Sequence, residues 1–274
     1  MSILASIVLF ENNPLQVAKT IDSVIESNLD VEILLIDNSP SDELSILSER
    51  GDRVNYIFNG KNIGYGSAHN IAIRRSMEIG SIYHLVLNPD VYFRGDILEN
   101  LYEFMEDNKD VGNIMPRVRY PNGDLQYLAK LLPTPVDLFL RRLFKNKRWR
   151  EKKEETYTLK FTKYDQLMNV PCLSGCFMFM RVSALMKVGI FDESFFMYFE
   201  DVDLNRRIHN NFKTIFYPRV EIVHEYSRGS YKNSKHLLFH IKSAIYYFNK
   251  WGWAFDSARK KINIDCLMNL KNDQ

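Results

Sequence analysis

The stretch "ILASIVLFENNPLQVAKTIDSVIESNLDVEILLID", residues 3–37, decides the fold. It begins and ends with a short, apolar, largely β-branched run, which is typical of a buried strand. Between the runs, Pro14 stands where a helix can begin, because proline is tolerated in the first helical turn. Apolar residues then recur on one helical face, at Val17, Ile21, Val24 and Ile25. This order predicts two parallel strands joined by a crossover helix.

The same alternation extends to residue 116. We predict strands in "RVNYIF" (53–58) and "IYHLVLN" (82–88), and helices over 66–79 and 96–108. Strands that alternate with helices form a mostly parallel sheet covered by helices on both faces, so the predicted fold class is α/β.

Polar turns follow three of these strands: "DNSPSD" (37–42), "NGKNIGYG" (59–66) and "NPD" (88–90). In open α/β sheets, ligands bind beyond the carboxyl ends of the strands. We therefore expect the ligand site at this edge of the sheet.

The pattern changes after residue 116. A turn is predicted at Asn122-Gly123, and the acidic segment 200–211 is predicted to form a short helix. Apolar strands are predicted in 170–181, 212–218 and 220–224, and two helices from Lys235 onward.

The composition bounds the class of protein. Of 274 residues, 46% are hydrophobic, which allows a sizeable core and excludes a disordered type. The formal net charge of +2 gives no general attraction to nucleic acid, so no nucleic-acid partner is expected. The cysteines Cys172, Cys176 and Cys266 are too few for a disulfide framework and are expected to be buried. No apolar run approaches the ~18 residues of a membrane span, and "MSILASIVLF" lacks the basic region of a signal peptide. A cytoplasmic location is expected.

Asp37 and Asp90 are candidate ligand-binding carboxylates at strand ends. Asp37 can accept a hydrogen bond from a nucleobase or ribose, although Asp-Asn-Ser-Pro is also a turn sequence. Asp90 follows Pro89, which ends the strand, and a carboxylate held there suits Mg²⁺ or Mn²⁺ carrying a diphosphate. His224, at the end of a late strand, can bind Mn²⁺-type ions or serve a structural role.

The middle turn, with Gly60, Gly64 and Gly66, opens a helix and is a candidate anion site. It is not the dinucleotide fingerprint, because His69 stands in place of the third glycine. An ordinary turn is the alternative.

The segment "FFMYFEDVDLNRR" (195–207) places three carboxylates directly after four aromatic residues: Glu200, Asp201 and Asp203. The structural explanation is a helix start, in which the helix dipole and Arg206 or Arg207 stabilise the acidic groups. The aromatic wall would also raise the pKa of at least one carboxyl group, as a general base requires.

Taken in order, these segments resemble glycosyltransferase family 2, the nucleotide-sugar-dependent inverting transferases with the GT-A fold. The resemblance covers roughly residues 1–228 and is nearest to the rhamnosyltransferase-like members. It rests on the order and spacing of "SIVLF", "LLIDNSPSD", "NIGYGSAHNIAI", "LVLNPDV", "LSGCFMFMR", "VGIFDESFFMYFEDVDLNRRI" and "YPRVEIVHEYSRGS". It implies a catalytic domain over 1–228, with a nucleotide-sugar half at about 1–116 and an acceptor half at about 117–228, and a helical appendage over 229–274.

The resemblance also implies roles for particular residues. Asp201 would be the catalytic base, with Glu200 beside it, and Asp90 and His224 would bind Mn²⁺ or Mg²⁺. The nucleotide sugar would be bound by Leu9, Phe10, Asp37, Asn62, Gly64, Asn70, Asn88 and Asp90, and the acceptor by Ser174, Gly175 and Glu200. Two positions depart from the family pattern: Asn88 replaces the first acid of D-x-D, and Leu9-Phe10-Glu11 replaces the usual Thr-Tyr-Asn.

The implied donor is dTDP-L-rhamnose, with a UDP-hexose or UDP-N-acetylhexosamine as the alternative, and the implied acceptor is a cell-surface or lipid-linked glycan. A nucleotidyltransferase would have no use for "FEDVDL" (199–204), and a non-catalytic sugar-nucleotide binder would not need Asp90, Asp201 and His224.

The segment Arg141–Lys153 has eight Lys or Arg against one Glu, with aromatic residues such as Trp149 between them. It predicts peripheral contact with an anionic membrane at the inner face of the cell, to which Trp251 and Trp253 would add. A solvated loop is the alternative.

Overall fold

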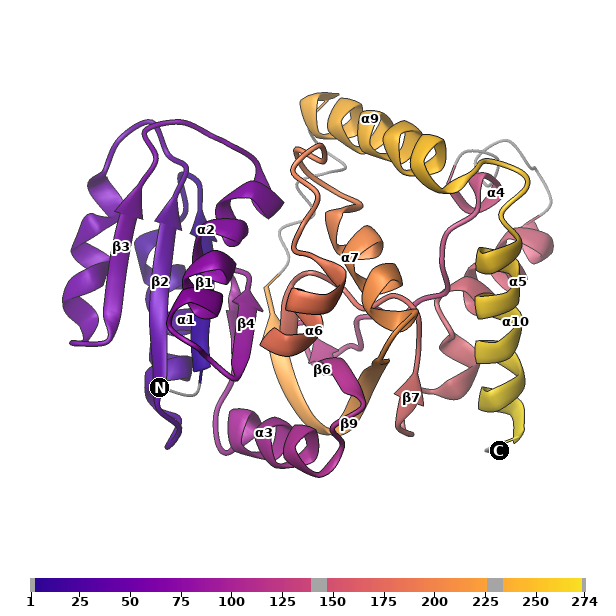
Figure 1. The fold of residues 1–274 in the computed structure, drawn as a ribbon, viewed down its shortest axis with the longest axis horizontal. Helices are drawn as coiled ribbons and strands as arrows, with labels where there is room; N and C mark the ends of the chain where they lie inside the picture. Colours follow the sequence, from indigo (N-terminus) through magenta and orange to yellow (C-terminus); the bar gives the residue numbers. More distant parts are fainter. Residues whose placement is uncertain (1–2, 139–146, 226–233, 273–274) are drawn as a thin grey trace.

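The computed structural model describes residues 3–138, 147–225 and 234–272. Its strands form one mixed sheet of nine strands in the order β3-β2-β1-β4-β8-β6-β9-β5, with β7 paired to β9 (Figure 1). The α/β class is confirmed.

The opening unit is confirmed as a parallel strand–helix–strand. It consists of β1 (Ile3–Leu9), α1 (Pro14–Ile25) and β2 (Val31–Asp37). The Asn13 side chain accepts a hydrogen bond from the amide of Leu15, which caps α1. The parallel set is completed by β3 (Val54–Phe58) beside β2 and β4 (Tyr83–Leu87) beside β1.

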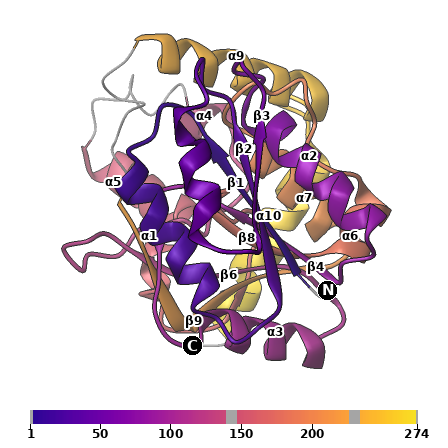
Figure 2. The ribbon, with the colours of Figure 1, turned by 90° about the vertical axis from the view of Figure 1, so that its left-hand side faces the viewer.

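Helices cover both faces of this sheet. Side chains of β1 point alternately to the two faces and pack with different helices. Ile3, Ala5 and Ile7 belong to the cluster of α1 and α3 (Ile97–Asp107), whereas Leu4 and Val8 pack with α2 (Tyr65–Glu78). Figure 2 shows α1 on one side of the strands and α2 on the other.

The second half of the sheet is not purely parallel. β8 (Phe177–Arg181) runs antiparallel between β4 and β6 (Val111–Arg119), whereas β9 (Lys213–His224) runs parallel to β6. The remaining strands are β5 (Val91–Tyr92) and β7 (Met168–Asn169), both antiparallel to β9.

Two strand predictions need correction. Residues 212–218 and 220–224 were predicted as two strands, but they belong to one strand, β9. The register of β9 on β6 shifts between Pro116 and Arg117. That irregularity accommodates Pro218, which cannot donate to a ladder. Within 170–181, only β8 pairs as a strand, while the preceding residues form the loop that reaches the acidic cluster.

The other helical elements lie in the first half and around the acceptor-side strands. They are η1 (Glu43–Arg50), α4 (Pro135–Leu138), α5 (Lys147–Tyr157), η3 (Lys160–Thr162), α6 (Val182–Val188) and α7 (Glu200–His209). The predicted turn at Asn122-Gly123 and helix α7 are confirmed, whereas η1, α5 and α6 were not predicted.

Two helices follow residue 229, as predicted: α9 (Ser234–Trp251) and α10 (Ser257–Asn272). Helix α10 packs on the rest of the fold through Cys266 and Leu270, which join the main hydrophobic cluster, and α9 packs through Tyr247 and Phe248, which share a buried cluster with Phe195. All three cysteines are buried. Within the described ranges, no helix is long and apolar enough to cross a membrane.

A buried polar network beneath α2 predicts acid sensitivity. His84 Nε2 lies 2.9 Å from Ser6 Oγ and its Nδ1 lies 2.7 Å from Ser76 Oγ, and burial lowers the pKa of His84 to about 3. Below about pH 6.5, His84 binds a proton in the unfolded chain but not in the native state. The free energy of unfolding therefore decreases as the pH falls from about 6.5 towards 3.

We expect the melting temperature to fall steeply from about pH 6.5 to about pH 4 in acid titrations followed by circular dichroism. His84→Gln keeps hydrogen-bonding capacity without titrating, so its melting temperature should depend less on pH in this range. Parallel losses in both proteins would show that His84 is not the acid-sensitive group.

Candidate active site

The ends of β1, β2 and β3 meet in register, since Leu9 pairs with Asp37 and Asp37 with Phe58. The Asp37 carboxylate is fully buried and accepts hydrogen bonds from the Ser39 amide (2.8 Å) and the Tyr56 hydroxyl (2.7 Å). These contacts anchor the turn that follows β2. Contact between the Asp37 carboxylate and a nucleoside remains a prediction.

Leu9 and Phe10, predicted beside the nucleoside, differ in exposure. Leu9 is buried and its carbonyl accepts a hydrogen bond from the Asn38 amide at 2.9 Å, whereas the Phe10 side chain is 46% exposed at the same sheet edge. Phe10 can therefore offer a flat apolar surface to a base, and Leu9 can contribute only backbone.

The glycine-rich turn (59–66) is hydrogen-bonded to the loop that precedes Glu200 and Asp201. Asn62 Oδ1 accepts a hydrogen bond from the Gly64 amide at 3.0 Å, and the Tyr65 amide donates to the Phe196 carbonyl at 3.0 Å. Gly64 has φ 94°, and a Cβ there would lie 2.6 Å from the Phe196 oxygen. Only glycine fits this close approach.

Asn70 lies farther from the sheet edge than its predicted role suggests. Its buried amide group donates to the Phe191 carbonyl and the Glu193 carboxylate, both at 2.9 Å, and accepts from the Phe191 amide at 3.0 Å. Asn70 therefore positions residues 191–193, and any effect on the nucleotide pocket would be indirect.

Asp90 and His224 come together at the other end of this edge. The β5–β9 pairing sets Val91 opposite His224, and Asp90 Oδ1 lies 3.3 Å from His224 Nε2. His224 is 4% exposed, and its Nδ1 lies 3.0 Å from Gln126 Oε1. Burial lowers the pKa of His224, but the neighbouring Cys176 and Asp90 raise it to about 10.

The Asp90–His224 pair fits a divalent cation. A carboxylate oxygen and a deprotonated imidazole nitrogen suit Mn²⁺, so a bound ion would displace the proton that Cys176 and Asp90 stabilise on His224. The Gln126 side chain fixes the orientation of the ring. Among the residues that the structure describes, no group of three or more His, Cys, Asp or Glu side chains gathers for a metal. Phosphate and water oxygens would have to supply the other ligands.

Tyr65 joins this edge to the acidic cluster. Its hydroxyl lies 3.0 Å from Asn88 Oδ1 and 2.7 Å from the Gly175 carbonyl. Burial raises the pKa of Tyr65, and the nearby Glu200 and Asp201 raise it further, so the hydroxyl stays protonated. Asn88, the departure from D-x-D, thus has a specific hydrogen-bonding role.

Asp201 lies in the first turn of α7, shortly after two residues with a strained backbone. Tyr198 and Phe199 have φ values of 71° and 70°, in the left-handed region that non-glycine residues rarely adopt. Asp201 Oδ2 accepts from the Gly175 amide at 2.9 Å and Oδ1 from the Val202 amide at 2.8 Å. These contacts fix the carboxylate at one place.

The pKa values of the two leading carboxyl groups differ. Burial raises the pKa of Asp201, but the amides of Gly175 and Val202 and the charge of Lys130 offset part of that rise. Glu200 is 5% exposed, its Oε2 has no hydrogen-bond partner, and burial followed by the Asp201 charge raises its pKa well above the ordinary value. The amide hydrogen bonds therefore favour ionisation of Asp201, whereas burial and the Asp201 charge favour the protonated form of Glu200.

Ser174 and Gly175, the predicted acceptor residues, lie in the loop before β8. The Ser174 hydroxyl accepts from the Cys176 amide at 3.3 Å, and a Cβ at Gly175 would lie 3.2 Å from Asp201 Cβ. Gly175 therefore lets this loop approach α7 closely.

The fold agrees with the comparisons with known proteins. The family described as "Glycosyl transferase family 2" matches residues 7–189, more than half of the chain. The chain belongs to glycosyltransferase family 2. Within it, the chain resembles rhamnosyltransferases, which confirms the resemblance found in the sequence.

Two curated relatives align with most of this transferase. An N-acetylglucosaminyl-diphospho-decaprenol L-rhamnosyltransferase of Mycobacterium tuberculosis is 27% identical over 79% of this chain and 74% of its own. Rhamnosyltransferase WbbL of Escherichia coli K12 is 25% identical over 90% of this chain and 89% of its own. A solved structure of GalNAc-T7 with UDP, GalNAc and Mn²⁺ is 16% identical, with a TM-score of 0.61 over 82% of this chain. This chain spans 43% of that structure, and the likeness confirms the GT-A fold.

Helix α7 of the transferase is held by buried charges that the sequence did not fully predict. The predicted Asp203–Arg207 pair is present at 2.9 Å. The alternative, Asp203–Arg206, is wrong, because Arg206 forms a two-pronged pair with Asp256 at 2.7 and 2.8 Å. Asp203 is fully buried and also accepts from Trp251 Nε1 at 2.7 Å, so a change there should cost more than a surface helix pair.

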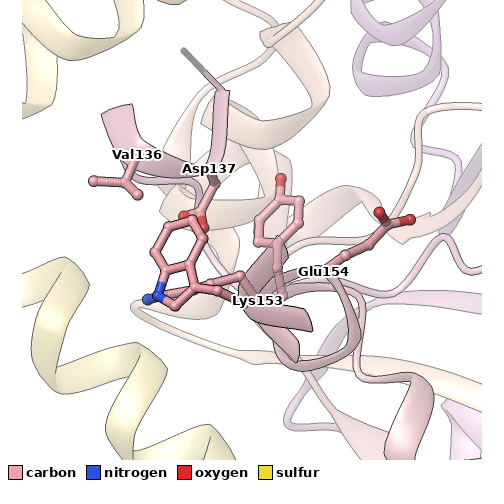
Figure 3. Close-up of a pocket in the computed structure, with 6 residues that line it drawn as sticks. Val136, Asp137, Lys153 and Glu154 are labelled. Atoms are coloured by element: carbon pink, nitrogen blue, oxygen red, sulfur yellow. The ribbon is translucent and has the colours of Figure 1, made fainter. Parts of the chain in front are cut away.

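The basic segment of the transferase is only partly described. Its residues 141–146 lie outside the described residues, and Lys147–Lys153 begin α5. Trp149 does not stand apart on the surface. It lines a small pocket with Val136, Asp137, Lys153, Glu154 and Tyr157 (Figure 3). The pocket has room for about one water molecule, at about 10 Å³, so it is too small for a sugar.

Proposed function

We propose that the chain is an inverting, metal-dependent transferase that moves L-rhamnose from dTDP-L-rhamnose to a hydroxyl group of a lipid-linked or cell-surface glycan. The observation that carries the proposal is the Asp201 carboxylate, held by the Gly175 amide beside a buried Glu200. Tyr65 connects the same loop to Asn88 at the donor edge. The names of the relatives support rhamnose, and a UDP-hexose or UDP-N-acetylhexosamine is the alternative donor.

Asp201 acts as the general base. Its carboxylate accepts the proton of the acceptor hydroxyl as that oxygen attacks the anomeric carbon, and the bond from that carbon to the nucleoside diphosphate breaks. Attack from the face opposite the diphosphate inverts the anomeric centre. Burial raises the pKa of Glu200 and so favours its protonated form, which would donate a hydrogen bond to the acceptor and orient it.

Asp90 and His224 would hold Mn²⁺ or Mg²⁺, with Gln126 orienting the imidazole. When bound, the ion supplies positive charge to the diphosphate leaving group. The Asn62–Gly64 turn stands at the start of α2, where the positive end of the helix dipole would favour the diphosphate.

The enzyme is proposed to act in the cytoplasm, at the inner face of the cell membrane. This location follows from the proposed lipid-linked acceptor. The diphospho-decaprenol in the name of the mycobacterial relative supports such an acceptor.

A thermal-shift panel of dTDP, UDP, GDP and NAD, each with Mn²⁺, tests the donor class. A nucleotide that binds the native state and not the unfolded state raises the melting temperature. We expect the largest rise with dTDP, the nucleotide part of the proposed donor. A larger shift with UDP would favour the alternative donor. Stabilisation by NAD alone would overturn the proposal.

The metal site makes a separate prediction. Asp90→Asn and His224→Ala should each weaken Mn²⁺-dependent donor binding by about 10- to 100-fold, because each removes a ligand or its charge. Calorimetry of dTDP binding with and without Mn²⁺ measures the effect, and Asp124→Asn in the exposed 121–124 turn is the control. If His224→Ala leaves the metal dependence unchanged, His224 has a structural role only.

A further inference from the structure

Helix α9 presents two different faces. Its inner face packs on the aromatic segment that precedes Asp201, where Phe195 and Phe199 share a buried cluster with Tyr247 and Phe248. The hydroxyl group of Ser243 donates to the Met197 carbonyl at 2.7 Å. This inner face is therefore part of the support for the catalytic segment, and α9 lies across one end of the molecule above α7 (Figure 1).

The outer face of α9 is apolar although it is exposed. Leu238, Ile241 and Ile245 are 50%, 36% and 41% exposed and follow one another at helical spacing, so they form one stripe. Trp253 is 40% exposed and donates to Asn249 Oδ1 at 2.8 Å, which places it one turn beyond Ile245. A packed surface helix normally carries polar residues on this side, so an apolar stripe indicates an interaction surface.

The charge of α9 identifies the partner. The helix contains Lys235, Lys242 and Lys250 but no Asp or Glu. Lys235 and Lys242 are exposed, and the helical spacing places both along one side of the stripe. An apolar stripe bordered by lysines, with a tryptophan at one end, fits the interface of an anionic phospholipid bilayer.

We propose that the outer face of α9 is the membrane-docking surface, with Leu238, Ile241 and Ile245 entering the headgroup boundary of an anionic bilayer. A second copy of the chain fits less well, because a twofold contact would bring the same lysines together. The purpose rests on the proposed function, since a lipid-linked acceptor lies in the bilayer. Trp251 bonds Asp203 in α7, so docking would hold Asp201 near the membrane surface.

Flotation with phosphatidylglycerol–phosphatidylcholine vesicles tests this surface without any transfer reaction. We expect the wild-type chain to bind anionic vesicles at low salt and to bind pure phosphatidylcholine vesicles at least about tenfold less. The triple variant Leu238→Ser, Ile241→Ser, Ile245→Ser should lose binding about tenfold or more. The matched control replaces three apolar residues with comparable or greater exposure elsewhere, Leu15→Ser, Ile46→Ser and Met186→Ser, and should bind like the wild type.

Donor-nucleotide binding and melting temperature of each variant separate this inference from the proposed function. A triple variant that binds dTDP with Mn²⁺ normally but no longer floats supports α9 docking. A triple variant that floats like the wild type overturns it, as does equal binding to neutral vesicles. If the wild type is a dimer that the triple variant converts to a monomer with unchanged flotation, α9 is a contact between copies instead.

Discussion

Asp201→Asn should lower kcat by about 10²- to 10⁴-fold, because it removes the proton acceptor while keeping the size and shape of the side chain. Donor binding should stay within about twofold of the wild type, since the proposed base acts on the acceptor hydroxyl, whereas Asp90 and His224 are the proposed ligands on the donor side. The measurements are turnover with a defined acceptor, calorimetric donor affinity and melting temperature.

The pH profile gives this prediction a second readout. Burial raises the pKa of Asp201, so the wild-type rate should fall as the pH drops through a value above its ordinary 3.8. Asp201→Asn should remove this acid limb from its residual rate, because no group at that position then titrates.

Glu200→Gln is the matched control for Asp201→Asn. Burial and the Asp201 charge favour the protonated form of Glu200 by raising its pKa, so an amide in its place should change kcat less than about tenfold and acceptor KM more. If Glu200→Gln abolishes turnover while Asp201→Asn retains it, the base is Glu200. If both variants and Asp203→Asn turn over normally, the acidic cluster is only the start of a helix.

The parts of the site that could be predicted from sequence are those fixed by local pattern. The strand ends at Asp37 and Asn88 follow from apolar runs bounded by turn residues, and the parallel register then brings neighbouring ends to one edge. The placement of Asp201 in the first turn of α7 follows from the acidic start and the apolar spacing of the segment. Each of these inferences needs only neighbours along the chain.

The parts that were missed depend on residues distant in sequence. Gln126 orients His224 across 98 positions, and Gly175 donates to Asp201 across 26. Neither residue type signals such a role by itself, since Gln and Gly occur at many surface turns. The left-handed backbone at Tyr198 and Phe199 was hidden for another reason, because aromatic residues ordinarily favour extended backbone. Tertiary contacts with α9 hold that strained turn in place.

Arg206→Met should lower the free energy of unfolding by about 3 kcal/mol or more, which is the largest stability effect we expect. Both members of the Arg206–Asp256 pair are almost completely buried, at 2% and 3% side-chain exposure. The Arg206 guanidinium also lies 4.0 Å from the centre of the Trp251 ring. Methionine can replace the apolar stem but leaves Asp256 charged in a dry environment, with only its contacts to Arg259 remaining.

A surface pair of the same residue types provides the control. Arg50 and Asp22 also meet at 2.7 Å, but their side chains are 38% and 43% exposed, so Arg50→Met should cost at most about 1 kcal/mol. Urea unfolding followed by circular dichroism measures both variants, and equal losses would contradict the role of burial. Arg206 belongs to the same helix as Asp201, and Asp256 lies in the turn after α9. Arg206→Met should therefore also lower kcat, because it would displace Asp201, the proposed base. An Arg206→Met protein with normal kcat below its melting temperature would show that α7 keeps its position without the Arg206–Asp256 pair.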